Sequence, residues 1–321
     1  MSGAILSAAV ALPQLRLAAG EIRGAWGGAP RGLRRKAVCA FDEDAITLAV
    51  EAARAACESG PEPGALFLGA TTLPYEERPA AASLATALTG RRDLAVHELR
   101  GSGQAGLQAL VLAGLWTAAR GVPALAVLAD APEGPEESAL GQACAAGAAA
   151  FLVGPGPGRA ELGAAVAATA ETFGHRFRRR GASRLSDLEL RTDPDAAPLA
   201  TLARAERPAG ARLAGALAPR LEARVAKTLG AEGDGLWPDL GDAGAASAGL
   251  ALAHRLDTAQ AGETVLALAF GGGATLLPVR ATGAGPGTLD LAGRLAGGRE
   301  VDYLTYLKHR RAVGPGREDG A

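Results

Sequence analysis

A predicted strand that runs through a glycine turn straight into an apolar helix constrains this chain more than any other feature. The strand is predicted at residues 94–99, the turn at 100–103 (Arg-Gly-Ser-Gly) and the helix at 104–116. Because the helix is apolar almost all round, we expect it to be buried. Two glycines let the backbone turn sharply and present one residue at the helix N-terminus, where free N–H groups favour an anion. This is the geometry of a nucleophile elbow, but the turn contains no cysteine.

Composition limits the class of protein. A length of 321 residues favours about two domain-sized units, and 48% hydrophobic with 21% charged residues is typical of a soluble globular chain. The net charge of −1 argues against nucleic acid as a main partner. Pro13 and Arg16 interrupt the first apolar stretch, so we expect neither a signal peptide nor a membrane span, and a cytoplasmic location. Cys39, Cys57 and Cys144 lack CxxC spacing, so no disulfide framework or metal site is indicated.

Strands and helices are expected to alternate along the whole chain. Strands are predicted at residues 4–10, 65–70, 94–99, 124–129, 164–169, 264–270 and 274–279, and a Gly/Ala turn leads into one more within 144–153. Helices are predicted at residues 18–26, 45–58, 80–88, 104–116, 198–205, 217–229, 244–256 and within the tail 301–313. Residues 31–36 are predicted to form a basic turn, and the acidic residues 42–44 to cap the helix that follows. The alternation predicts an α/β chain with mostly parallel strand pairing.

A family resemblance is carried by residues 41–53, 69–75 (Gly-Ala-Thr-Thr-Leu-Pro-Tyr), 103–108 and 261–271, and also by the tail 301–310. These stretches resemble the thiolase superfamily, in particular its hydroxymethylglutaryl-CoA synthase and ketoacyl synthase III branch. The resemblance implies a duplicated thiolase-like fold in five αβαβα layers. Its halves would be residues 1–160 and 161–321, with a short tail from about residue 299. It also implies that helices 104–116 and 244–256 lie side by side between two sheets.

The family's chemistry is covalent acyl transfer from a thioester by a cysteine at the elbow, supported by a histidine, an asparagine and, in the synthase branch, a glutamate. Family spacing puts the cysteine on Arg100 or Gly101 and the glutamate on Thr71. The histidine falls on Gly215 or Leu217, and the asparagine on Asp242 or Leu240. The four chemical groups are therefore absent or changed on each alignment, which predicts a degenerate catalytic site.

The sequence gives little support to another residue as nucleophile in place of the cysteine. Ser102 lies in the turn, but a serine needs an adjacent base; His97 is near in sequence, yet strand neighbours alternate faces. We therefore interpret Ser102 as a turn residue. Cys144, at a Gly/Ala turn, is interpreted as a small buried hydrophobe rather than a displaced nucleophile. Asp242 is expected to cap the helix 244–256, and Arg100 is either a strand-end charge or fills the space of an acyl group.

An arginine cluster forms part of a loosely structured arm at residues 173–195. It contains Arg176, Arg178, Arg179, Arg180 and Arg184. One interpretation is a solvated arm; the other is contact with the phosphates of a coenzyme A tail, because arginine forks suit phosphate. The expected ligand is a coenzyme A thioester, with no covalently bound cofactor.

Three functions follow from the resemblance. The first is a catalytically degenerate subunit that scaffolds an acyl-CoA condensing or acyltransferase complex. The second is an active acyltransferase whose nucleophile has moved to Ser102 or Cys144. The third is a module that binds acyl-CoA without turnover. The resemblance further implies a dimer formed through strand 94–99, with itself or with a related active thiolase-fold subunit, and a separate zinc-ribbon/OB-fold partner.

Overall fold

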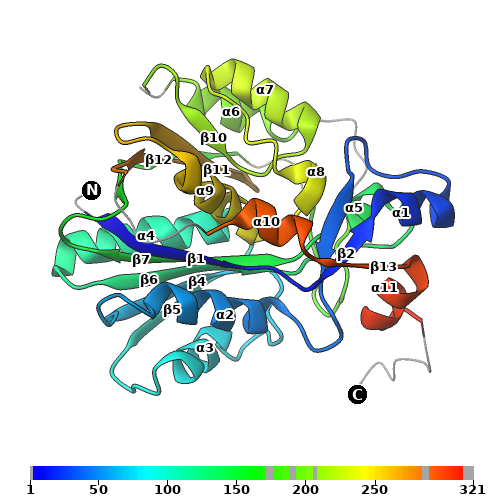
Figure 1. Ribbon diagram of the computed structural model, residues 1–321, viewed down its shortest axis with the longest axis horizontal. Coiled ribbons are helices and arrows are strands. Elements are labelled where there is room, and N and C mark those ends of the chain that lie inside the picture. The colour runs from blue at the N-terminus through cyan, green and yellow to red at the C-terminus, as the bar shows by residue number, and fades with distance from the viewer. Residues whose placement is uncertain (1–2, 171–175, 188–192, 205–207, 284–288, 314–321) are drawn as a thin grey trace.

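The computed structural model describes residues 3–170, 176–187, 193–204, 208–283 and 289–313. In the described part of the chain, helices and strands form five layers in the order αβαβα (Figure 1). This is the αβαβα arrangement that the resemblance implied.

The first sheet layer is formed by the N-terminal part of the chain. Its strands are β1 (Ala4–Ala11), β7 (Gly147–Gly154), β6 (Ala124–Asp130), β4 (Ala65–Gly69) and β5 (Ala95–Leu99), side by side in that order. Helices α2 (Ala45–Cys57) and α3 (Ala80–Leu88) cover its outer face (Figure 1). Helix α2 begins as predicted with an acidic cap, because the Asp44 carboxylate accepts a hydrogen bond from the Thr47 N–H at 2.7 Å.

The second sheet layer belongs to the C-terminal part. It contains β8 (Ala160–Leu162), β9 (Val166–Thr169), β10 (Arg212–Ala214), β11 (Thr264–Phe270) and β12 (Gly273–Ala281). Helices α6 (Ala196–Leu202) and α7 (Pro219–Leu229) lie outside it (Figure 1). Strand β8 pairs with both β1 and β12, so the two layers form one ten-stranded sheet among the described residues.

Strand pairing is mixed, so the prediction of mostly parallel pairing is wrong. Strand β4 is parallel to β5 and β6, and β10 is parallel to β11, but β1–β7, β6–β7 and β11–β12 are antiparallel. The physical reason is the connection length. A tight glycine turn joins β11 to β12 directly, and such a turn can only reverse the chain.

The central layer consists of α4 (Ala105–Arg120) and α9 (Ser247–Thr258), the latter preceded by the short 3-10 helix η1 (Gly244–Ala246). Both helices contact both sheet layers, as predicted. Gly106 makes the close approach: a Cβ atom there would lie 2.0 Å from the Ala245 carbonyl oxygen. The prediction of burial all round is wrong for α4, because Leu112 and Leu115 are 39% and 46% exposed.

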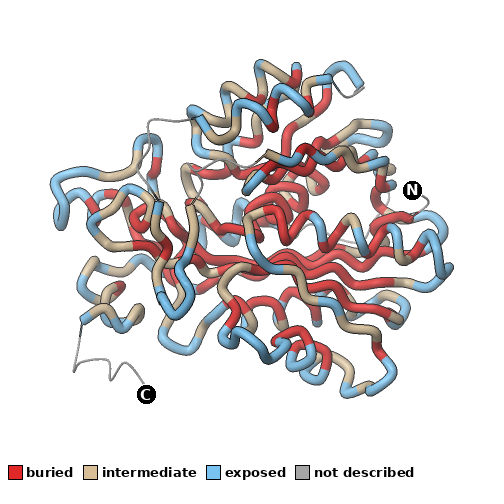
Figure 2. The backbone as a smooth tube through the Cα atoms, turned by 180° about the vertical axis from the view of Figure 1, so that it is seen from behind, coloured by how far each residue is buried: buried red, intermediate tan, exposed pale blue. Residues whose placement is uncertain are grey.

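Three apolar cores fill the spaces between the five layers. Figure 2 shows the buried strands running through the middle of the molecule, with exposed backbone mainly in the outer helices and loops. The cores are built mainly of alanine, leucine and valine, since aromatic residues make up only 4% of the chain. Small side chains allow the helices and sheets to approach closely.

A smaller three-stranded sheet lies beside the main body, and sequence reasoning missed it. It consists of β13 (Arg299–Val301), β2 (Leu15–Ala18) and β3 (Arg35–Val38), flanked by α1 (Ala19–Trp26) and α11 (Tyr303–His309). The predicted basic turn at 31–36 is wrong at its end, because Lys36 lies within β3 and is 1% exposed.

The remaining helices are α5 (Ala139–Ala143), α8 (Trp237–Leu240) and α10 (Leu291–Ala296). None of the helices in the described ranges is long and apolar enough to cross a bilayer.

Candidate ligand-binding cleft

A cleft of about 1110 Å³ opens between the two sheet layers beside the turn at residues 100–103. Most of the residues carried over from the family resemblance line it. They are Thr71, Arg100, Gly101, Ser102, Gly215, Leu217 and Asp242 together with the arginines 176, 178 and 179. Leu240 and Cys144 are not among the lining residues. Residues that are far apart in sequence therefore meet here, as the resemblance implied.

The elbow is held in place by the turn between β11 and β12. The Gln104 side-chain amide donates to the Gly271 carbonyl at 2.6 Å, and its oxygen accepts from the Thr275 hydroxyl at 2.8 Å. A Cβ on Gly271, whose φ is +145°, would lie 2.8 Å from the Ser102 Cβ. Only glycine fits at this contact, because Ser102 and the Gly103 backbone leave no room for a side chain there.

The Ser102 hydroxyl behaves as a turn residue. It accepts a hydrogen bond from the Gln104 N–H at 3.3 Å. Within the described residues, the lining of the cleft contains no histidine, lysine or cysteine. A serine needs an adjacent base to become a nucleophile, whereas the contact of the Ser102 hydroxyl with the Gln104 N–H is that of a turn residue.

Arg100 is turned toward the loop at residues 75–78. Its guanidinium donates to the Tyr75 carbonyl at 2.6 Å and forms an ion pair with Glu98. These contacts favour the interpretation of Arg100 as a strand-end charge that fixes the loop at the rim of the cleft.

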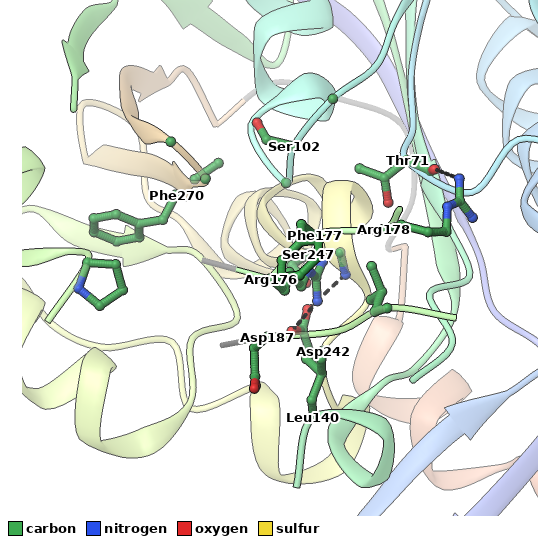
Figure 3. A pocket seen from close by; sticks show the side chains of 18 of the residues that line it. Thr71, Ser102, Leu140, Arg176, Phe177, Arg178, Asp187, Asp242, Ser247 and Phe270 are labelled. Atoms are coloured by element: carbon green, nitrogen blue, oxygen red, sulfur yellow. Dashed lines mark hydrogen bonds and ion pairs between the residues drawn. The ribbon is translucent and has the colours of Figure 1, made fainter. Parts of the chain in front are cut away.

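Arg176 and Asp242 form an ion pair on the floor of the cleft (Figure 3). The Arg176 guanidinium donates to one Asp242 carboxylate oxygen at 2.7 Å, and the other oxygen accepts from the Gly244 N–H at 2.9 Å. Asp242 therefore fixes the backbone at Gly244, but the prediction that it caps the helix is wrong. The N-cap residues of η1 and α9 are Ala243 and Ala246, and neither segment has a side-chain cap hydrogen bond. Burial opposes the charge on Arg176 most strongly, but the nearby acidic groups, Asp242 first among them, together raise the pKa of Arg176 above its ordinary value.

Asp130 holds the lining residue Thr71 in place, and sequence reasoning missed it. It ends β6, is fully buried, and accepts from the Thr71 hydroxyl at 2.7 Å, the Thr72 N–H at 2.9 Å and the Ala245 N–H at 2.8 Å. One carboxylate thus joins the end of β4 to the start of the α9 segment. The available signal was an aspartate at the end of an otherwise apolar strand, 124–130.

A hairpin of residues 176–187, called the cleft hairpin here, lies along one side of the cleft. Phe177 and Ser186 exchange two backbone hydrogen bonds of 2.8 Å. The Arg178 guanidinium donates to the Thr71 carbonyl at 2.9 Å, and Arg184 donates to Glu136 at 2.7 Å. Part of the predicted arm, residues 173–175 and 188–192, lies outside the described residues. Arg176, Arg178 and Arg184 thus have protein partners, and contact of this cluster with coenzyme A phosphates stays a prediction.

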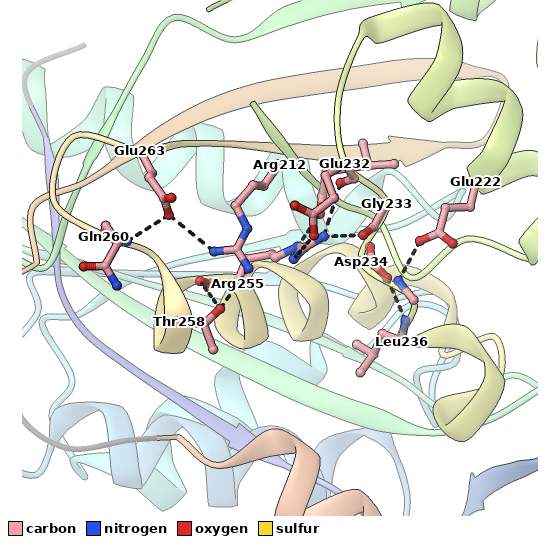
Figure 4. A network of polar contacts seen from close by, with 12 residues as sticks. Arg212, Glu222, Glu232, Gly233, Asp234, Leu236, Arg255, Thr258, Gln260 and Glu263 are labelled. Carbon is pink, nitrogen blue, oxygen red and sulfur yellow. Dashed lines mark hydrogen bonds and ion pairs between the residues drawn. The ribbon is translucent and has the colours of Figure 1, made fainter. Parts of the chain in front are cut away.

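The wall opposite the elbow is fixed by a polar network (Figure 4). One Asp234 carboxylate oxygen accepts from the Gly215 and Ala216 N–H groups at 2.7 and 2.9 Å. Arg255 donates to the Leu213 carbonyl at 3.0 Å and to Glu232 at 3.1 Å. The network holds the backbone at Gly215, where the family histidine would stand, but it presents no imidazole. His254 of α9 is half-buried, does not line the cleft, and has its pKa lowered by burial.

Cys144 does not line the cleft, although its backbone pairs with that of Asp242, which does. It is buried beside a separate cavity of about 260 Å³ that is also lined by Tyr306 and Arg310. Burial raises the pKa of its thiol to about 11, so the thiolate is scarce at neutral pH. Elsewhere in the described ranges, no three or more His, Cys, Asp or Glu side chains gather as a metal site requires.

Comparison with known proteins identifies the family. No protein-family model matches the chain. A hydroxymethylglutaryl-CoA synthase from Methanosphaera stadtmanae is 30% identical over 293 residues, which cover 82% of this chain and 83% of that protein. The chain belongs to the hydroxymethylglutaryl-CoA synthase family. A synthase of the same name from Methanocaldococcus jannaschii is 28% identical over 94% of this chain and 96% of its own.

Solved structures of low sequence identity share the fold of this chain. MvaS in complex with 3-hydroxy-3-methylglutaryl coenzyme A superposes with a TM-score of 0.75 at 21% identity, covering 98% of this chain and 94% of that one. An HMG-CoA synthase complexed with CoA gives 0.80 at 16% identity, covering 96% and 90%. The 3-oxoacyl-(acyl carrier protein) synthase III FabH from Pseudomonas aeruginosa PAO1 gives 0.73 at 19% identity, covering 88% and 99%.

Proposed function

We propose that this chain is a catalytically degenerate member of the hydroxymethylglutaryl-CoA synthase family that supports an acyl-CoA condensing or acyltransferase complex. It binds a coenzyme A thioester in the cleft beside the elbow and does not form an acyl-enzyme. The observation that carries the proposal is the described lining of the cleft, which lacks cysteine and histidine and holds the Arg176–Asp242 ion pair on its floor.

The chemical reason is that the parts of an acyl-transfer site act as a unit. Losing the nucleophile together with its partners forfeits most of the covalent acceleration. At the positions implied for the cysteine stand Arg100, held by Glu98 and Tyr75, and Gly101. The cleft itself is retained. The two synthase structures with bound coenzyme A species support a ligand of this class.

Mass spectrometry after incubation with acetyl-CoA and acetoacetyl-CoA tests the degenerate site. We expect binding without a stable acyl adduct, and background turnover that Ser102→Ala and Cys144→Ala leave unchanged. An adduct on either residue, or a rate loss of more than about a hundredfold in either variant, would show a relocated nucleophile. The chain would then be the active acyltransferase of the second hypothesis.

Restoring the thiol provides a complementary test. Arg100→Cys places a thiol near the start of α4, but the positions implied for the family's other catalytic groups carry no imidazole or amide to polarise the thioester carbonyl. Removing a single oxyanion donor commonly costs about a hundred- to a thousandfold. We therefore expect at most slow self-acylation of this variant and no condensation.

The partners of the proposed complex are a second thiolase-fold subunit and a zinc-ribbon/OB-fold protein. The subunit, either a second copy or a related active chain, would pair with β5, which ends the sheet order. The OB-fold partner rests on the resemblance of the tail 301–310. Co-expression with a candidate condensing subunit and co-purification of a stoichiometric complex tests both.

A further inference from the structure

We infer that the C-terminal helix α11 controls the cleft hairpin, through the acidic segment 133–136 that lies between them. The inference rests on the proposed function only in naming an acyl-CoA as the ligand whose access changes. Its physical content is a continuous set of polar contacts from Arg310, at the end of α11, to residues that line the cleft.

The first step links α11 to the acidic segment. The Arg310 guanidinium donates to the Tyr306 hydroxyl at 2.7 Å and to the Gly134 carbonyl at 3.3 Å. It also lies 3.4 Å from the Glu133 carboxylate and 3.6 Å from that of Glu136. The Arg310 side chain is only 8% exposed, and these contacts keep it charged. One buried guanidinium therefore ties the segment to the helix.

The second step links the same segment to the cleft hairpin. The Leu185 N–H donates to the Glu133 carbonyl at 2.7 Å. Arg184 donates to one carboxylate oxygen of Glu136 at 2.7 Å, while the other oxygen faces Arg310. The Glu136 side chain is 11% exposed. Glu136 is thus a shared anion, and its position depends on a cation from the hairpin and a cation from α11.

The third step leads from the hairpin into the cleft. Its other side carries Arg176 and Arg178, which bind Asp242 and the Thr71 carbonyl, and Phe177 lines the cleft between them. Loosening the hairpin on its Glu136 side weakens the constraint that keeps these groups in the cleft. Because α11 carries Arg310, a change in the docking of α11 reaches the cleft without touching a lining residue.

Hydrogen–deuterium exchange of the ligand-free, full-length protein tests the inference. In Arg310→Gln and in Glu136→Gln we expect the hairpin amides of Phe177, Leu185 and Ser186 to exchange about fivefold faster, the loss expected of one ion pair. Glu137→Gln is the matched control, since Glu137 is the exposed neighbour of Glu136. That variant should leave hairpin exchange unchanged.

Arg184→Gln separates the two ends of the connection. It loosens the hairpin directly and should give the same increase in hairpin exchange, with a smaller increase in α11, because coupling through Glu136 is reciprocal. The inference is overturned if Arg184→Gln raises hairpin exchange but Arg310→Gln raises exchange only in α11 and in residues 133–136. If Arg310→Gln does not fold, Arg310→Lys replaces it, because lysine keeps the charge but cannot donate to all the acceptors of the guanidinium. Unchanged hairpin exchange in Arg310→Lys would also overturn the inference.

Acetyl-CoA binding kinetics provide the second readout. The dissociation rate should increase in Arg310→Gln and Glu136→Gln by a factor similar to that of hairpin exchange. Absence of acetyl-CoA binding by the unmodified protein would contradict the proposed ligand, whereas the exchange experiment decides the coupling independently. An unchanged dissociation rate in variants with faster hairpin exchange would contradict control of the cleft by the hairpin.

Discussion

At the scale of single residues, buried charges organise this molecule. Asp130 receives hydrogen bonds from two loops that are far from it in sequence, and Arg176 is held by Asp242. Lys36 is buried under α11, where its ammonium donates to the Gly141 carbonyl at 3.1 Å and the Tyr306 hydroxyl at 3.2 Å. Each of these groups is costly to bury alone and is stabilised only by its partners.

Asp130→Asn should destabilise the protein strongly. The asparagine keeps the shape but replaces one acceptor oxygen by an amide that faces N–H donors, such as that of Ala245. We expect a loss of at least about 2 kcal/mol in the free energy of unfolding, measured by urea denaturation. Asp93→Asn, at an exposed pair with Arg91, should leave it nearly unchanged. Equal losses in the two variants would contradict the role of Asp130.

Lys36 should make stability depend on pH. Burial lowers its pKa from 10.5 to about 7, so between these values the unfolded chain binds a proton that the folded chain does not. The free energy of unfolding therefore rises with pH across this window, and the penalty is largest below pH 7. Relative to Lys36→Met, the unmodified protein should gain stability between about pH 7 and 10. Urea denaturation across this range measures the difference, and the exposed Lys308→Met should show none.

At the scale of elements, the central helices depend on backbone contact. Gly106 of α4 lies so close to Ala245 that no side chain fits between them. This contact sets the distance between α4 and the start of α9, and so the position of the elbow relative to Asp242. The elbow is fixed on its other side by Gln104 and the turn at Gly271.

Gly106→Ala should separate the two helices. Its methyl group would meet the Ala245 carbonyl, and such overpacking commonly costs about 1 to 3 kcal/mol. Gly24→Ala is the matched control: it also lies in a helix, but a Cβ there meets open space, so it should stabilise the protein by up to about 1 kcal/mol. Thermal unfolding measures both. A neutral Gly106→Ala would mean that the helices can move apart without loss.

At the scale of the whole molecule, one side of the sheet remains open. Strand β5 has a partner on one side only in the described part of the chain, and α4 exposes Leu112 and Leu115. An open strand edge is an aggregation hazard unless it is covered. These features favour a second thiolase-fold subunit at this edge.

We expect sedimentation to show a dimer at micromolar concentration. Leu112→Lys with Leu115→Lys should shift it to monomer, because two charges would be buried in the interface. Leu304→Lys is the control, since Leu304 is 54% exposed on the distant α11. A stable, soluble monomer of the unmodified protein would count against self-association and leave only the heterodimer, which co-purification tests.

The elements that local pattern determines were predicted closely. Helix α3 and strand β11 begin and end at the predicted residues, because a short apolar segment between polar or proline-containing flanks has few alternatives. The elbow was placed correctly for the same reason. Cleft membership of Thr71, Gly215 and Asp242 came from the family resemblance, since no local pattern joins residues so far apart.

Only the tertiary structure decided how the charged residues are used. In the local sequence pattern, Arg16 interrupts an apolar stretch and Lys36 belongs to a basic turn. Both nevertheless lie in strands of the small sheet. Arg16 is satisfied there by the carbonyls of Arg294 and Leu295, nearly the whole chain away. Asp130 is likewise buried with partners that are distant in sequence. The free energy of a buried charge depends on its partners in space, and sequence neighbours carry no information about them.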